Sequence, residues 1–290
     1  MFNKLEFKKI RDFGEIINDT FTFIRQNLKP LLTVFIYICG IFLLAAMIGN
    51  VLQQIDTLNN VQNLASGRIR TRSTVFNFQY FLALFLTFAN YNAISVVVLS
   101  YIAIYIEKGK VIPTIEEVWG YFKYYFFRTF ASSIVITLFM IVCAIPCGIP
   151  FIYVFPMMSI FLPIMIFENG SFSYSFGRCF KLVKENWGLT AGAIFIIWII
   201  TYATMLIGSI PTIVLNVAGT FISGGKGVNH VLVFFVVLLQ SLFQVFFIVP
   251  TVCVAICYFN LVERHENSGL MGRINDLGEK KADFNSTEEY

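Results

Sequence analysis

The sequence predicts an all-α integral membrane protein with six transmembrane helices. Apolar residues make up 57% of the 290 positions and charged residues only 13%, whereas a soluble domain carries about a quarter charged residues. Aromatic residues reach 17%, with 33 phenylalanines. A water-soluble core of this size could not bury so much apolar surface, so lipid is expected to solvate most of the chain.

Six apolar runs are long enough to cross a bilayer, which takes about 20 residues in a helix. The predicted spans are 31–50, 79–106, 129–146, 150–167, 188–214 and 231–259. The third and fourth are joined by IPCGIP, a tight turn, and are expected to form a hairpin. Prolines inside the spans should kink their helices, which neighbouring helices tolerate in lipid; these prolines are Pro156, Pro163, Pro211 and Pro250.

An amphipathic segment precedes each pair of spans. Segments 10–28, 113–126 and 172–187 place apolar side chains at helical spacing on one side and charged side chains on the other. Short, basic, aromatic-rich helices beside a span lie in the membrane interface, with their cations against anionic headgroups. We therefore expect three transmembrane hairpins, each preceded by a cytoplasmic amphipathic interfacial helix. The candidate contacts to lipid headgroups are Arg25, Lys29, Lys123, Arg128, Arg178, Lys181 and Lys184.

The pattern predicts a single membrane domain, 1–262, followed by a polar cytoplasmic tail, 263–290, that is partly disordered. Within the domain, three pseudo-repeat units are expected at 7–106, 114–167 and 171–262. FIRQNL at 23–28 matches LVKENW at 182–187 in residue type, which links the first and third units. The first span is expected to continue outward as an amphipathic helix, because apolar residues recur at helical spacing at Val51, Ile55, Leu58, Val61 and Leu64.

The basic residues predict an orientation. Most of the 21 lysines and arginines fall in the N-terminal segment, the second and fourth connections and the tail, and the exceptions are Arg68, Arg70, Arg72 and Lys226. The positive-inside rule places the basic side in the cytoplasm, so both termini are expected there. The charged N-terminus shows no cleaved signal peptide. The net charge of +4 then reflects topology, and no nucleic-acid partner is expected.

No catalytic or metal-binding constellation is visible. The sequence contains no H-E-x-x-H, no G-x-S-x-G and no P-loop. The cysteine pairs Cys143/Cys147 and Cys253/Cys257 have i,i+4 spacing, but no histidine is near them in sequence, so packing is favoured over a buried metal site. A disulfide framework is not expected, because no cysteine lies in a long polar loop. No cofactor or metal is predicted, and a non-enzymatic role is favoured over a membrane-embedded enzyme.

Polar residues inside the second and sixth spans form a candidate intramembrane polar patch, which consists of Asn90, Asn92, Ser95, Gln240 and Gln244. Hydrogen bonds between helices, typically ~0.6 kcal/mol each and up to ~2 kcal/mol, are the favoured interpretation. The alternative is a polar substrate path between these two helices. No ionisable residue lies inside the predicted spans, which argues against a proton relay.

Glu168 ends the fourth span and is followed by NGSFSYSFGRCFKLVKENWG. This pattern resembles a broad group of largely uncharacterised bacterial six-helix membrane proteins, including the membrane domain fused to some glycerophosphodiester phosphodiesterases. The resemblance implies the bacterial inner membrane and a phospholipid-related role, and it supplies no catalytic residues. Our first hypothesis is a non-enzymatic scaffold or accessory subunit that engages anionic lipid and a protein partner. The second is a transporter or lipid-handling protein with a polar path between the second and sixth spans.

Overall fold

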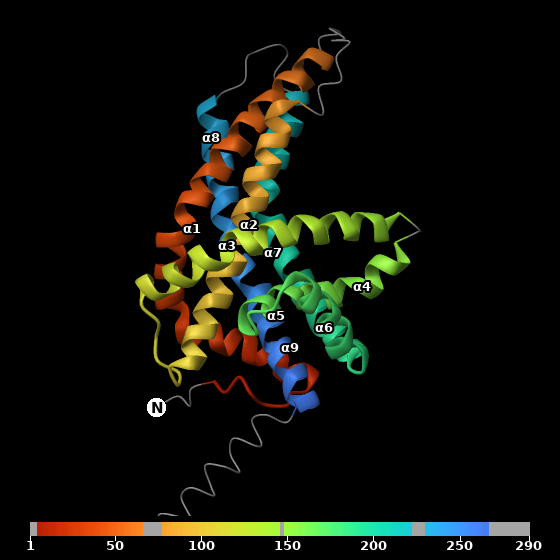
Figure 1. Ribbon diagram of the computed structural model, residues 1–290. Helices are drawn as coiled ribbons and strands as arrows, with labels where there is room; N and C mark the ends of the chain where they lie inside the picture. The colour runs from red at the N-terminus through yellow and green to blue at the C-terminus, as the bar shows by residue number, and fades with distance from the viewer. Residues whose placement is uncertain (1–4, 66–76, 146–147, 222–229, 267–290) are drawn as a thin grey trace, which may run out of the picture. The chain divides into compact units, whose positions relative to one another are not determined.

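The computed structural model describes residues 5–65, 77–145, 148–221 and 230–266 (Figure 1). All regular structure in these ranges is helical. The elements are α1 (Phe13–Ala65), α2 (Phe78–Glu107), α3 (Ile115–Ala144), α4 (Ile149–Ser159), α5 (Phe161–Phe167), α6 (Phe172–Lys184), α7 (Trp187–Phe221), α8 (His230–Leu242), the 3₁₀ helix η1 (Phe243–Phe247) and α9 (Ile248–Glu266).

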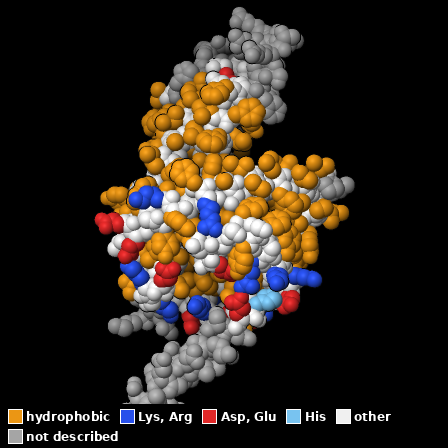
Figure 2. Space-filling view, viewed as in Figure 1, with side chains coloured by type: hydrophobic (Ala, Val, Ile, Leu, Met, Phe, Trp, Pro, Cys, Tyr) orange, Lys and Arg blue, Asp and Glu red, His pale blue; other side chains and the backbone are white. Residues whose placement is uncertain are grey.

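The six predicted spans are confirmed as helical segments long and apolar enough to cross a membrane. Within the described ranges these segments are Phe13–Asn60, Phe78–Glu107, Ile115–Ala144, Ile149–Phe167, Trp187–Leu215 and Val231–Glu266. Their exteriors suit lipid, since large apolar side chains point outward along α1 at Ile36, Tyr37, Ile41, Leu44 and Ile48. Figure 2 shows hydrophobic side chains covering long stretches of the helices.

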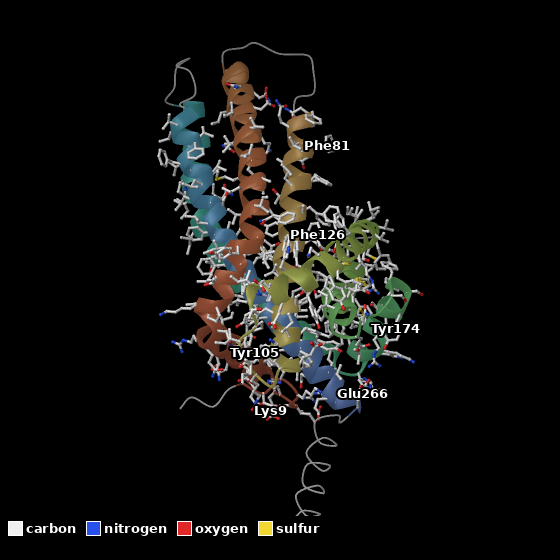
Figure 3. The ribbon with its side chains drawn as sticks, turned by 60° about the vertical axis from the view of Figure 1, so that its left-hand side comes forward. Lys9, Phe81, Tyr105, Phe126, Tyr174 and Glu266 are labelled. Carbon is white, nitrogen blue, oxygen red and sulfur yellow. The ribbon has the colours of Figure 1, made fainter. Side chains whose placement is uncertain are left out.

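The chain forms two compact units, each assembled from segments that are distant in sequence. Unit 1 comprises Met1–Gln26, Ile136–Phe195 and Val252–Tyr290, and unit 2 comprises Asn27–Val135 and Ile196–Thr251. These boundaries differ from those of the three predicted repeats, which stay a prediction. Within unit 2, α3 crosses α2 instead of lying along it (Figures 1 and 3).

The first two amphipathic segments are not separate helices, contrary to expectation. The first forms the opening turns of α1, which continues for 53 residues, or about 80 Å at 1.5 Å per residue. The second forms the start of α3. Pro30 lies inside α1 without ending it, as is tolerated where neighbouring groups satisfy the freed backbone. Among the three segments, only the third has a helix of its own, α6.

The prolines in the fourth and sixth spans coincide with interruptions of the helix. The fourth span divides into α4 and α5 between Pro156 and Pro163, and the sixth contains the 3₁₀ segment η1 just before Pro250. A proline has no N–H to donate to the carbonyl four residues earlier, which explains why the regular ladder fails there. By contrast, α7 continues through Pro211.

The predicted helical continuation of the first span beyond residue 50 is confirmed, because α1 reaches Ala65. Its outer part joins a hydrophobic cluster within unit 2, in which Leu58 and Met47 of α1 are buried with Val233 and Val237 of α8. Further members packed against this cluster are Val51, Ile55, Leu215 and Leu238. The side chains of Val61 and Leu64 lie outside those that the structure describes.

Candidate functional site

The predicted headgroup contacts divide into two classes by exposure. The exposed side chains are Arg25, Lys29, Lys123, Lys181 and Lys184, whereas Arg128 and Arg178 are half-buried. The Lys123 ammonium lies 5.8 Å from the centre of the Trp119 ring. Among the described residues, no carboxylate lies within ion-pair distance of Lys181 or Lys184. These two lysines are therefore available to an anion outside the protein.

Helix α6 holds these two lysines on its exposed side, because hydrogen bonds define its ends and its opposite face packs in the protein. Ser171 caps the N-terminus, with its side chain accepting a hydrogen bond from the backbone N–H of Tyr174. Gly170 precedes the cap at a site where a Cβ would come within 2.6 Å of the Tyr174 ring. The buried face consists of Ser175, Cys179, Leu182 and Val183, which recur at helical spacing.

The end of α6 is equally well defined. After Lys184 the backbone N–H of Asn186 donates to the carbonyl of Val183, and α7 begins at Trp187. The Trp187 indole donates to the carbonyl of Tyr153 at 3.0 Å. This hydrogen bond ties the start of α7 to α4 within unit 1. Burial raises the pKa of the Cys179 thiol above its ordinary value, so that side chain packs as a neutral group.

Glu168 accepts hydrogen bonds from three side chains on two other helices. The hydroxyls of Tyr258 and Tyr174 donate to its two carboxylate oxygens at 2.9 Å and 2.7 Å. Arg178 Nε donates to Oε1 at 3.4 Å, and the same guanidinium forms an ion pair with Glu266. Figure 3 labels Tyr174 and Glu266 at this place in unit 1. We call these five residues the Glu168 cluster.

The Glu168 cluster joins the end of α5, helix α6 and the end of α9. Because both oxygens of Glu168 already accept donors, the carboxylate is suited to holding helices together and not to abstracting a proton from a substrate. Its hydrogen bond raises the pKa of the Tyr174 hydroxyl above the usual range. Arg178 was predicted to face a headgroup, but the structure places its guanidinium against two carboxylates of the protein itself.

A second polar cluster surrounds Arg11, which sequence reasoning did not single out. The Arg11 side chain is fully buried, and its Nε donates to Asp19 at 2.7 Å. Its Nη1 donates to the carbonyls of Phe7 and Lys9, and its Nη2 donates to the carbonyl of Glu6. No sequence motif identifies this residue, because most of its partners are main-chain carbonyls.

One hydrogen bond within unit 2 joins two residues of the predicted intramembrane patch. The side-chain amide of Asn90 on α2 donates to Gln244 Oε1 on η1, and both residues are buried. The Asn90 Oδ1 atom is buried without a hydrogen-bond partner. A buried amide oxygen without a donor costs free energy, roughly 1–3 kcal/mol.

Asn92 faces a different helix. Its amide donates to Thr129 Oγ1 and to the carbonyl of Phe126, both on α3. The hydroxyl of Ser133 donates in return to Asn92 Oδ1 at 3.4 Å. These contacts join α2 to α3 where the two helices cross, and they are interhelical hydrogen bonds of the kind that the favoured interpretation expects.

Two other members of the predicted patch lie elsewhere. Ser95 donates to the carbonyl of Tyr91 in its own helix. Gln240 accepts a hydrogen bond from Thr212 of α7 at 3.0 Å, at an exposed position. Gln240 was grouped with the polar residues of α2, but its hydrogen-bond partner Thr212 lies on the fifth span.

Close packing fixes η1 against α7 in unit 2. A Cβ on Gly208 of α7 would lie 2.5–2.9 Å from ring atoms of Phe243, so only glycine allows this ring to rest on the helix backbone. Aromatic contacts add to this packing, since the Phe247 ring lies 4.4 Å from that of Tyr91 and 5.2 Å from that of Trp198. A 3₁₀ segment inside a helix frequently marks a hinge or local strain.

No group of three or more histidine, cysteine, aspartate or glutamate side chains that could hold a metal occurs in the part of the chain that the structure describes. The free cysteines there are Cys39, Cys143, Cys179, Cys253 and Cys257. Cys147, a member of one predicted i,i+4 pair, lies outside the described residues. Comparison of the chain with protein-family models, with curated proteins and with solved structures finds no match.

Proposed function

We propose that this chain is a non-enzymatic multi-pass membrane scaffold or accessory subunit whose helix α6 engages anionic lipid headgroups. The observation that carries the proposal is the exposed pair Lys181 and Lys184 on a helix whose opposite face is buried. Residues three apart are neighbours on a helix surface, so both cations can approach the same headgroup. A third cation of this helix, Arg178, is held by protein carboxylates.

The proposal includes the expected orientation, in which both termini and the basic connections face the cytoplasm of a bacterial inner membrane. The resemblance of the segment after Glu168 to bacterial six-helix membrane proteins supports an envelope role related to phospholipid. A protein partner would meet the same cytoplasmic face, where the polar residues of unit 1 gather. A partner that co-purifies with the chain in mild detergent would support the scaffold role directly.

Native mass spectrometry of the chain extracted with anionic lipid tests the headgroup contact. Each basic residue near an anionic surface contributes about 1 kcal/mol, so reversing the charge of Lys181 and Lys184 to glutamate should weaken lipid retention by at least about 30-fold. The matched control, Lys181→Arg with Lys184→Arg, keeps the charge and should retain lipid. Equal lipid retention by the glutamate and arginine variants would show that these two lysines of α6 do not bind the headgroup.

A second candidate function is transport or lipid handling along a polar path between the second and sixth spans. The buried Asn90 Oδ1 without a partner, beside the 3₁₀ break in the sixth span, favours it. A Gln244→Cys variant separates the two functions. A water-filled path would make this thiol react with a membrane-impermeant reagent, whereas the packed amides of a scaffold would keep it unreactive until the chain unfolds.

A further inference from the structure

Residues Leu5–Arg11 form a bent segment, which we call the strap, before helix α1. The chain bends at Phe7–Lys9, where the backbone N–H of Lys9 donates to the carbonyl of Phe7 at 2.9 Å. The strap has no regular structure and packs within unit 1. Its buried side chains are Leu5, Phe7 and Arg11, and its exposed side chains are Glu6, Lys8, Lys9 and Ile10. Burial alternates from Leu5 to Lys8, so one side of the strap faces the protein and the other faces solvent.

The groove is formed by the start of α1 and the end of α9. The Phe7 ring meets the Phe23 ring edge-on at 5.1 Å and the Phe259 ring at 5.4 Å. The backbone N–H of Leu5 donates to Gln26 Oε1 at 3.3 Å. Aromatic side chains on both walls therefore form a pocket for one aromatic ring.

Helix α9 also holds the strap through its main chain. The backbone N–H of Arg11 donates to Asn260 Oδ1 at 2.8 Å, and the Arg11 carbonyl accepts from Arg264 Nη2 at 2.9 Å. Asn260 and Arg264 lie one turn apart on one face of α9. Asn260 and Arg264 bind both the N–H and the C=O of Arg11, so they recognise the main chain of the strap, as peptide-binding grooves do.

The contacts that hold the strap against unit 1 are few enough for the strap to detach while the helices stay folded. Only two apolar side chains are buried, and the other contacts are hydrogen bonds that water can replace. The buried Arg11–Asp19 ion pair adds little net stability, because desolvation offsets the attraction between the charges. Segments with few buried apolar contacts unfold locally at the low end of the free-energy scale of a protein.

We infer that the start of α1 and the end of α9 form a peptide-binding groove, which the chain fills with its own strap, and that the strap opens as an independent unit. The groove accepts a peptide that bends as the strap does, with an aromatic residue followed four positions later by arginine, as Phe7 and Arg11 are spaced. This inference does not depend on lipid binding by α6.

Hydrogen exchange of the full-length chain in lipid nanodiscs tests the opening. Arg11→Lys removes the forked donors but keeps the positive charge, and it should speed exchange of the strap amides by about tenfold, as expected for the loss of one or two hydrogen bonds. Exchange in α5 and α6 should be unchanged. Faster exchange throughout unit 1, or strap amides that exchange only with global unfolding in the wild-type chain, would overturn the inference.

A second variant covers the case in which Arg11→Lys fails to fold. Arg264→Gln replaces the half-buried donor to the Arg11 carbonyl and leaves the Arg11–Asp19 pair intact. Arg264→Gln should also speed hydrogen exchange of the strap amides without speeding exchange in α5 and α6. If Arg264→Gln speeds exchange in α5 and α6 as much as in the strap, the segment is part of the folded core and not a separable unit.

A synthetic peptide tests the groove itself. Fluorescent LEFKKIRD, which corresponds to residues 5–12, should bind the Arg11→Lys variant, whose groove side chains are unchanged, at least about tenfold more tightly than it binds wild type. A control peptide with alanine at the positions of Phe7 and Arg11 should not bind. Failure of LEFKKIRD to bind a variant in which exchange has shown the strap to be open would exclude a peptide-binding groove.

Discussion

Replacing Glu168 by glutamine should destabilise unit 1, because the three donors around this carboxylate would lose their negatively charged acceptor. A hydrogen bond to a charged group contributes about 1.5–3 kcal/mol and a neutral one about 0.5–1.5 kcal/mol, a difference of roughly 1 kcal/mol per bond. The Arg178 side chain is 23% exposed and Glu168 17% exposed, so solvent screening reduces the sum of three bonds to about 2 kcal/mol.

The assay is thermal unfolding of the full-length chain in one detergent. A loss of about 2 kcal/mol should lower the midpoint by about 5 °C for a chain of this size. Glu185→Gln is the matched control, because Glu185 is 73% exposed and lies 3.8 Å from its partner His265. Such a pair contributes little, and the control should unfold within about 1 °C of wild type. Equal midpoints for Glu168→Gln and the control would refute the structural role of the Glu168 cluster.

The loss of stability in Glu168→Gln should depend on pH. The hydrogen bond to Glu168 raises the pKa of Tyr174, so the contact stabilises the folded state below the ordinary tyrosine value of about 10. This stabilisation is lost as the pH rises through the raised pKa of the folded state. The difference in unfolding midpoint between wild type and Glu168→Gln should therefore be full at pH 7 and should narrow above about pH 10.

Two further experiments test the packing of unit 2. In a double-mutant cycle with Asn90→Leu and Gln244→Leu, the coupling free energy of unfolding should be about 0.6 kcal/mol and at most ~2 kcal/mol, and a value of zero would mean that the amide pair adds no stability. Gly208→Ala should lower stability by about 1–3 kcal/mol, because its Cβ would overlap the Phe243 ring. The control is Gly40→Ala, because a Cβ at position 40 would have no heavy atom within 4 Å. This alanine should raise the free energy of unfolding by about 0.5–1 kcal/mol. An equal effect of both alanines would contradict the packing argument.

The spans could be predicted from the sequence because lipid imposes a local requirement. Each crossing must satisfy its own backbone hydrogen bonds and be apolar over a bilayer thickness, and both properties are visible in about 20 consecutive residues. The starts of α1 and α3 could not be predicted from the same pattern. Where an amphipathic segment continues directly into a span, the hydrophobic pattern changes but the backbone stays helical. The change of pattern therefore does not reveal whether a separate helix ends there.

The sites were less predictable, because their partners are remote in sequence. Arg178 pairs with Glu266, 88 positions away, and helical periodicity alone placed it on a face turned towards headgroups. The amide pair is an intermediate case. The sequence pattern placed Gln244 among the candidate patch residues, and Gln244 accepts a hydrogen bond from Asn90. The same pattern cannot reveal that Gln240, one turn earlier, accepts a hydrogen bond from Thr212 of another helix.

Different residues near the end of α9 take part in the two polar clusters of unit 1 described above. Tyr258 and Glu266 belong to the Glu168 cluster, whereas Asn260 and Arg264 contact the strap. Side chains on one helix can act independently when they share no partner and their substitutions add. If α9 is a rigid support, loosening one side should leave the other unchanged, and the variants Glu168→Gln and Arg11→Lys would then have additive effects on unfolding. Non-additive effects would instead make the end of α9 a two-state element through which the strap and helix α6 influence each other.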